Sequence, residues 1–136
     1  MPLKFFVNSD GTTDILAKQG ESWDILIQIT DEDGNPIDLT GYSVKGMMKA
    51  NYDDSVATAV FNCSIKDPSN GIIEAKLSPS ETSNITPYPK SADNVRISSV
   101  SEGTQGVYVY DIKVYNDEIA FRVLEGKIVV DPGVSK

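Results

Sequence analysis

Apolar and polar residues alternate with a period of two in several segments of this 136-residue chain. The alternation is clearest from Ser22 to Thr30, where Asp24 and Gln28 share one face and apolar residues occupy the other. Successive side chains of a β-strand point to opposite sides, so this pattern predicts a half-buried strand. The side chains expected to point inward are Trp23, Ile25, Ile27 and Ile29.

Two later segments repeat the alternation on either side of a run of turn residues. Ala57–Ile65 alternates with Cys63 on its apolar face, and Gly71–Leu77 alternates in the same way. The residues between them, Asp67–Gly71, combine aspartate, proline, serine, asparagine and glycine, which are the residue types that tight turns prefer. We therefore expect the two segments to pair as a β-hairpin.

The C-terminal part of the chain predicts a second pair of strands. Val107–Tyr115 alternates regularly and places Tyr108 and Tyr110 on its apolar face, where core packing is the simplest role for them. Phe121–Val130 shows a phase slip around Gly126, which indicates a β-bulge. Weaker alternation predicts three further strands, over Leu3–Val7, Thr13–Ala17 and Tyr42–Lys49.

One short helical turn is expected after Leu77. Ser78–Glu81 combines an N-cap serine, a proline at the first helical position and a glutamate three residues after the serine. Seven or eight short strands with a single helical turn favour an all-β fold, an antiparallel two-sheet β-sandwich of the immunoglobulin-like type. Residues 1–136 would form one such domain, and a β-barrel is the alternative.

A long loop is predicted at about 82–106, where no alternation is sustained. Within it, Pro87 and Pro89 flank Tyr88, so this tyrosine cannot belong to a strand interior. Loops of this length often carry binding residues, and a loop folded back on its own sheet is an equal alternative. The candidate partner-binding residues are Pro87, Tyr88, Pro89, Lys90 and Arg96.

The charge balance argues against nucleic-acid and membrane partners. The formal net charge is -8 and the pI about 4.4, which repels phosphates and anionic head groups, and the 12 Lys and Arg residues are scattered singly. Cys63 is the only cysteine, which excludes an internal disulfide framework and suits a reducing compartment. No apolar stretch approaches about 20 residues, so we expect neither a secretory leader nor a membrane span.

Catalytic chemistry is largely missing from the sequence. The chain has no histidine, which removes the commonest general base and metal ligand, and it has no phosphate-binding or dinucleotide-binding glycine motif. We expect no enzyme, no cofactor, no metal site and no small-molecule substrate. The enzymatic alternative is a carboxylate-dependent hydrolase, for which the acidic residues single out no pair.

The acidic run Asp31–Asn35 is the nearest approach to a metal-binding motif. Alignment of Gly34 with the invariant glycine of a calcium loop places Ile29 at the first ligand position and Thr40 where a bidentate glutamate belongs. The run is therefore interpreted as a solvated turn, with a weak irregular Ca²⁺ site as the alternative.

A set of sequence runs, which correspond to strand starts, turns and a final strand, covers most of the chain. These runs are Gln19–Ile25, Ile29–Tyr42, Gly71–Ile73, Leu77–Thr82, Gly106–Asp111 and Leu124–Val130. They resemble small tail and baseplate proteins of tailed bacteriophages, in particular the N-terminal β-sandwich domain of baseplate upper proteins. Lys90–Gly106 departs from that pattern and looks like an insertion.

The resemblance implies a structural protein of the virion, made in the cytoplasm of the host bacterium. Such a domain is implied to attach a fibre, a receptor-binding protein or a neighbouring ring subunit to the tail, and the family has no catalytic residues to carry over. Repeated copies in a closed ring would give a small domain high avidity, so a homo-oligomer is expected. The alternative function is a carbohydrate-binding or adhesion module, suggested by the six tyrosines and the sandwich fold.

Overall fold

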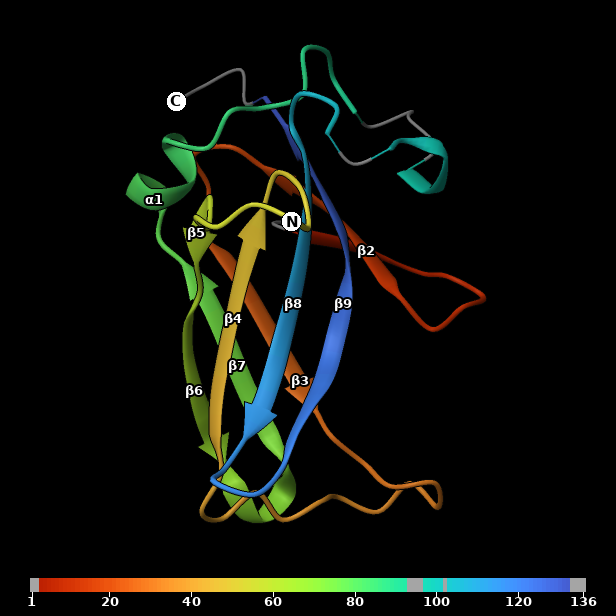
Figure 1. Ribbon diagram of the computed structural model, residues 1–136, viewed down its shortest axis with the longest axis vertical. Helices are drawn as coiled ribbons and strands as arrows, with labels where there is room; N and C mark the ends of the chain where they lie inside the picture. The colour runs from red at the N-terminus through yellow and green to blue at the C-terminus, as the bar shows by residue number, and fades with distance from the viewer. Residues whose placement is uncertain (1–2, 93–96, 102, 133–136) are drawn as a thin grey trace.

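The computed structural model describes residues 3–92, 97–101 and 103–132 (Figure 1). Its helical elements are one short α-helix, α1 (Pro79–Ser83), and two 3-10 turns, η1 (Pro68–Asn70) and η2 (Ile97–Ser99). The strands are β1 (Leu3–Val7), β2 (Thr13–Lys18), β3 (Trp23–Gln28), β4 (Ser43–Lys49), β5 (Ala59–Val60), β6 (Asn62–Asp67), β7 (Ile72–Leu77), β8 (Val107–Tyr115) and β9 (Ala120–Asp131). The predicted all-β chain with a short helix after Leu77 is confirmed.

The strands form two sheets that pack face to face. One sheet has the strand order β1-β2-β9-β8-β4-β5 and the other has the order β3-β7-β6. The β6–β7 and β8–β9 hairpins pair as expected. The expectation of a wholly antiparallel sandwich is wrong at one place, because β2 and β9 run parallel. Alternation alone carries no information on strand direction, and a parallel pair joined through the rest of the chain leaves no turn signal.

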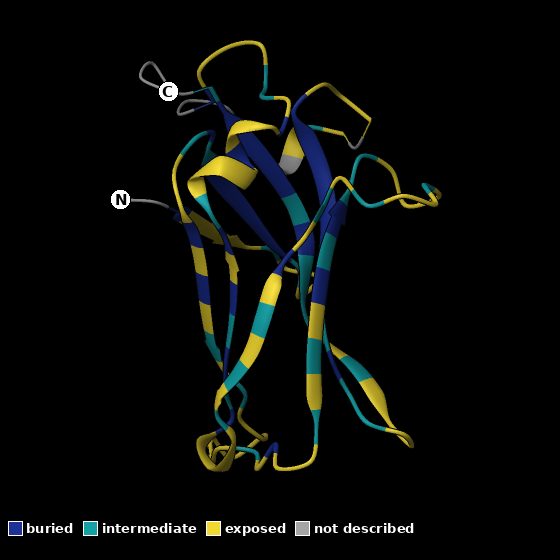
Figure 2. Cartoon of the chain, turned by 90° about the vertical axis from the view of Figure 1, so that its left-hand side faces the viewer, coloured by how far each residue is buried: buried dark blue, intermediate teal, exposed yellow. Residues whose placement is uncertain are grey.

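The core lies between the two sheets and contains the side chains that the alternation turned inward. Trp23 and Ile25 of β3 and Ile73 of β7 face Tyr110 and Ile112 of β8 in one apolar cluster. Figure 2 shows the consequence along the strands, where buried and exposed residues follow one another in turn. The inward faces predicted for these three strands are confirmed.

The strand predicted over Ala57–Ile65 is divided between the two sheets. β5 pairs with β4 of the large sheet, whereas β6 pairs with β7 of the small one. The crossing residue is Phe61, which is buried and donates its backbone N–H to the carbonyl of Gly46 at 2.9 Å. The alternation stays in phase through the crossing, so the sequence shows one strand where the structure has two. Strands that change sheets in this way form the corners of a sandwich.

The helix α1 is closed at its N-terminus by the capping box that the sequence predicted. The backbone N–H of Glu81 donates to the Ser78 hydroxyl at 3.2 Å, and the Glu81 carboxylate accepts the Ser78 backbone N–H at 2.9 Å. These bonds satisfy donors that a helix start leaves free. Pro79 occupies the first turn, where its missing N–H costs nothing.

The predicted β-bulge exists but lies three residues before Gly126. The β8–β9 register shifts between Ile112 and Lys113, which pair with Leu124 and Arg122, so Val123 is the extra residue. Gly126 has a different reason to be glycine. A Cβ atom there would lie 2.2 Å from the carbonyl oxygen of Thr13 on β2, so the close approach of β2 to β9 requires a residue without a side chain.

Gly126→Ala should therefore destabilise the fold by about 3 kcal/mol or more, because backbone atoms of β2 and β9 must separate. Gly41→Ala is the matched control. Gly41 has φ +86° but no atom within 4 Å of its ideal Cβ, so its cost is the backbone conformation alone, about 1–2 kcal/mol. Urea unfolding of both variants tests the difference, and equal losses would contradict the close-approach argument.

Candidate interaction surfaces

The predicted loop at 82–106 is packed, over its described residues, against the six-stranded sheet. Strands β2, β8 and β9 bury apolar side chains on the face turned away from the first core, and residues of the segment cover them (Figure 1). This second cluster consists of Leu16, Ala92, Ile97, Val107 and Val129, with Tyr88 and Val100 packed against it. The segment thus folds back on its own sheet, which is one of the two arrangements that the sequence allowed.

The five predicted partner-binding residues lie in different surroundings. Tyr88 is half-buried, and its backbone N–H donates to the carbonyl of Val130 at 2.7 Å. Pro87 is also half-buried, whereas Pro89 and Lys90 are exposed. Tyr88 therefore holds the segment on the sheet, and the exposed part of the predicted set is Pro89 and Lys90. The fifth predicted residue, Arg96, lies outside the described residues.

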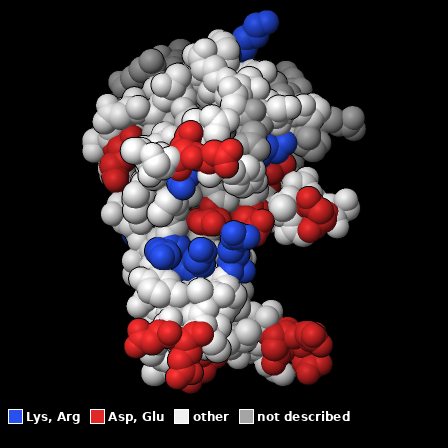
Figure 3. Space-filling view, in the orientation of Figure 1, with Lys and Arg blue, Asp and Glu red and all other residues white. Residues whose placement is uncertain are grey.

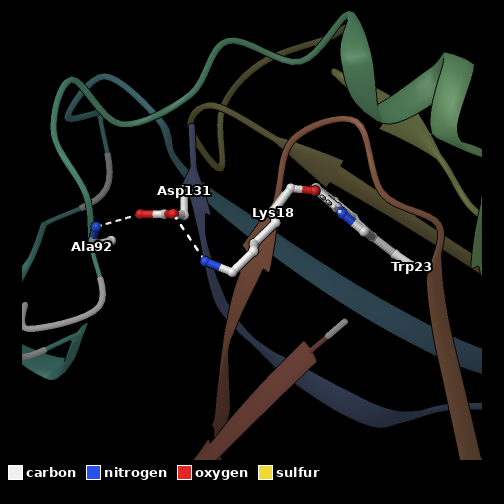
Figure 4. A network of polar contacts seen from close by, with 4 residues as sticks. All are labelled: Lys18, Trp23, Ala92 and Asp131. Atoms are coloured by element: carbon white, nitrogen blue, oxygen red, sulfur yellow. Dashed lines mark hydrogen bonds and ion pairs between the residues drawn. The ribbon is translucent and has the colours of Figure 1, made fainter. Parts of the chain in front are cut away.

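A buried carboxylate joins this segment to the sheet and to the core (Figure 4). Asp131, at the end of β9, is 4% exposed; one of its oxygens accepts the Lys18 ammonium at 3.1 Å and the other accepts the backbone N–H of Ala92. The Lys18 carbonyl accepts the indole N–H of Trp23 at 2.8 Å. Charged hydrogen bonds of this kind are about twice as strong as neutral ones. The position of the segment is therefore coupled to the centre of the core.

Asp131→Asn should loosen the segment before it unfolds the protein. The change removes the charge opposite Lys18, and the expected loss of stability is about 2–3 kcal/mol. The Ala92 amide should exchange its hydrogen at least about tenfold faster. Glu74→Gln, which weakens pairs with the exposed ammonium groups of Lys66 and Lys76, is the control and should leave exchange at Ala92 unchanged. Unchanged exchange at Ala92 would contradict the anchoring role of Asp131.

Burial holds one thiol and two phenols, those of Cys63, Tyr108 and Tyr110, in their protonated forms at neutral pH. Burial raises the pKa of the Cys63 thiol from its ordinary 9.0 to about 11, which makes it a poor nucleophile at neutral pH. The Tyr108 and Tyr110 hydroxyls donate to the carbonyls of Thr86 at 2.7 Å and Thr13 at 2.6 Å, and burial is the main cause that raises both of their pKa values. These tyrosines are core residues, as the alternation predicted.

Acidic residues do not converge into a metal site within the described ranges 3–92, 97–101 and 103–132, where no group of three or more Cys, Asp or Glu side chains could hold an ion. The Asp31 carboxylate instead closes its own turn, accepting the backbone N–H groups of Asp33 at 2.9 Å and Asn35 at 3.0 Å. These bonds are typical of a turn whose aspartate mimics the backbone, which agrees with the solvated-turn interpretation of this run.

The raised pKa values predict an alkaline loss of stability. In the folded state Cys63 titrates near 11 rather than 9.0, so its protonated form is favoured by folding. That contribution is complete below pH 9 and is lost as the pH rises through about 11. Urea midpoints should therefore fall over this range, and Cys63→Ala should show a shallower fall. An equally steep fall in the variant would show that Cys63 is not responsible.

Strand β1 presents an exposed apolar edge. It pairs with β2 on one side and is the terminal strand of the six-stranded sheet, and the β1–β2 hairpin extends from the body of the molecule (Figure 1). Phe5, Phe6 and Val7 are 48%, 43% and 79% exposed. Because neighbouring strand residues point to opposite faces, these three place apolar surface on both sides of the edge. The alternation predicted this strand but not its exposed edge. The sequence signal for the edge is the run of three consecutive apolar residues in so short a strand.

A groove of about 360 Å³ lies on the outer face of the six-stranded sheet, over β4, β8 and β9. The charged side chains that line it are Lys45, Lys49, Asp111, Lys113, Arg122 and Glu125. The sequence shows these cations singly and far apart, and strand pairing brings them together. The bulge at Val123 is part of the cause, because it lets both Arg122 and Glu125 reach this face although they are three residues apart.

No protein-family model matches the chain, and no curated protein matches it. Among the described helical elements, none is both long enough and apolar enough to cross a membrane.

Proposed function

We propose that this protein is a non-enzymatic structural or assembly protein of a tailed-bacteriophage particle. It would bind neighbouring tail, baseplate or fibre subunits through protein–protein contacts. The proposed place in a phage particle rests on the resemblance of the strand and turn runs to baseplate proteins. The proposal includes an immunoglobulin-like form of the sandwich. The observation that carries the binding role is the exposed apolar edge of β1.

An edge such as β1 can pair with a strand from another subunit. Its outer backbone N–H and C=O groups have no neighbour among the described strands, and an added strand would bond to them in the way that β2 bonds on the other side. Phe5 and Phe6 would then pack against side chains of the added strand, one on each face. Edge strands that stay free are usually protected by charge, proline or a bulge. In β1 the one charged residue is Lys4, at the second position.

The 82–106 segment, over the outer face of the six-stranded sheet, supplies a second surface for a neighbouring subunit. Pro89 and Lys90 are exposed on a stretch that Tyr88 and Asp131 hold in place. Pro89 follows Tyr88, whose backbone N–H is held by the Val130 carbonyl, so Pro89 loses little conformational freedom on binding. A small loss of freedom lowers the cost of association. The six tyrosines that suggested a glycan-binding role give it little support, because Tyr52 is the one tyrosine among them whose side chain is largely exposed.

Charge placed on the β1 edge should block incorporation into particles. Phe5→Lys combined with Phe6→Lys introduces two ammonium groups at residues that are about half exposed, so folding should be retained while strand addition is lost. The expected result is at least about tenfold less protein in purified particles, measured by quantitative mass spectrometry. Val56→Lys, at a loop residue that is 77% exposed, is the control and should be incorporated normally.

The same measurement on the unmodified protein tests whether it belongs to a phage particle. The protein should be present in purified particles of the virus that encodes it, in several copies per particle. Consistent absence from the particles would contradict the proposal as a whole, whereas normal incorporation of the double lysine variant would contradict only the role of β1.

A further inference from the structure

Three cations stand side by side across the outer face of the large sheet. Lys45 on β4 is directly opposite Lys113 on β8, and Lys113 is directly opposite Arg122 on β9. Figure 3 shows positive charge gathered as a band over these strands. Like charges at directly opposed positions destabilise a sheet, so folding alone gives no reason for this cationic row. It is all the more unusual in a protein whose net charge is -8.

The cationic row is only partly neutralised within the described part of the chain. Arg122 forms ion pairs with Asp111 at 3.3 Å and Glu125 at 3.7 Å, and Lys45 lies 4.8 Å above the ring of Tyr115. The central cation, Lys113, has no carboxylate within ion-pair distance among the described residues. The groove is lined by four cations and two carboxylates, a local excess of two positive charges; these side chains are Lys45, Lys49, Lys113, Arg122, Asp111 and Glu125.

The surroundings of the cationic row favour a compact anionic partner. Met47 and Tyr52 contribute apolar surface to the groove beside the cations. Negative charge lies above and below the band in Figure 3. An extended polyanion such as a nucleic acid, or a flat anionic membrane, would meet that negative charge as well as the cationic row. A short turn that carries a few carboxylates could contact the cationic row alone, without meeting that negative charge.

The chain itself carries such a turn, in the segment between β3 and β4. Asp31, Glu32 and Asp33 are exposed, and the turn is fixed by hydrogen bonds to the Asp31 carboxylate and by a bridge between Thr30 and Pro36. Figure 1 shows this segment extending from the body at the lower right, and Figure 3 shows carboxylates gathered there, apart from the cationic row. A turn that is already ordered loses little entropy when it docks.

We propose that the cationic row Lys45–Lys113–Arg122 binds the acidic turn Asp31–Asp33 of a second copy of this chain. Row and turn are different surfaces of one molecule, so the contact is head-to-tail and repeats into a ring or a filament. It is separate from the β1 edge, and it identifies a partner and a site that the proposed function leaves open. Salt should weaken it, because the charges of both surfaces are accessible to solvent ions.

Charge reversal with complementation tests this contact. In sedimentation velocity experiments at about 50 mM NaCl the unmodified protein should associate reversibly, and at about 500 mM at least about tenfold more weakly. Lys113→Glu, and separately Glu32→Lys combined with Asp33→Lys, should each reduce association at least about tenfold. A mixture of the two variants should form a heterodimer, because each supplies the surface that the other lacks. Lys76→Glu, on the small sheet, is the control and should associate normally.

Stability measurements separate a lost contact from a lost fold. Lys113→Glu places a carboxylate between Lys45 and Arg122, so its unfolding temperature should rise by about 1–5 °C while association falls. A simple folding defect would lower both. The Phe5→Lys, Phe6→Lys protein should associate like the unmodified chain in this assay, which distinguishes failure of this contact from failure of the β1 proposal.

Three results would overturn the proposal. They are a strictly monomeric unmodified protein at all concentrations tested, normal association of Lys113→Glu, and a mixture of the two reversed variants that stays monomeric. Binding of duplex DNA or of anionic phosphatidylserine vesicles that is lost in Lys113→Glu, without self-association, would assign the cationic row to a different class of partner.

Discussion

Trp23 occupies the space between the two sheets, and the rest of the structure depends on how it is held. It is 1% exposed, and its indole N–H donates to the carbonyl of Lys18, which fixes the turn between β2 and β3. Lys18 then forms an ion pair with Asp131, and the Asp131 carboxylate accepts a hydrogen bond from the backbone N–H of Ala92 in the 82–106 segment. A single line of contacts therefore connects the core to the surface. Burial of so large a side chain stabilises the fold by about 2–3 kcal/mol, and its hydrogen bond sets its orientation.

The large sheet is covered on both faces at one end and exposed on its outer face at the other. At the first end, Val107 of β8 is buried as well as its neighbour Tyr108, because the described part of the 82–106 segment covers the outer side. Lower on the same strand, Asp111 and Lys113 face the groove instead. The segment thus defines where the sheet is sealed and where it is open. The proposed contacts of the β1 edge and of the cationic row use parts of the sheet that it leaves free.

Alternation predicted the strands well because it reports directly on which side chains are buried. The inward faces of β3, β7 and β8, the Ser78 capping box and both hairpins follow from residues that are near one another in the chain. The sheet crossing at Phe61 was not predictable, since the pattern stays in phase there. Neither was the parallel β2–β9 pair, whose register depends on residues about a hundred positions apart. The cationic row depends on long-range information through the β4–β8 register, which places Lys45 opposite Lys113. It also depends on the β8–β9 register with its bulge at Val123, which the sequence pattern placed around Gly126 instead.

Hydrogen exchange of the β1 backbone tests the central claim, that this protein works through sheet surfaces left open for other subunits. In the free protein the outer amides of Leu3–Val7 should exchange much faster than those of the central strands β8 and β9, because β1 pairs on one side only among the described strands. In assembled particles the same amides should become protected to the level of the central strands. Equal and slow exchange of β1 in both states would contradict an edge that is open for docking.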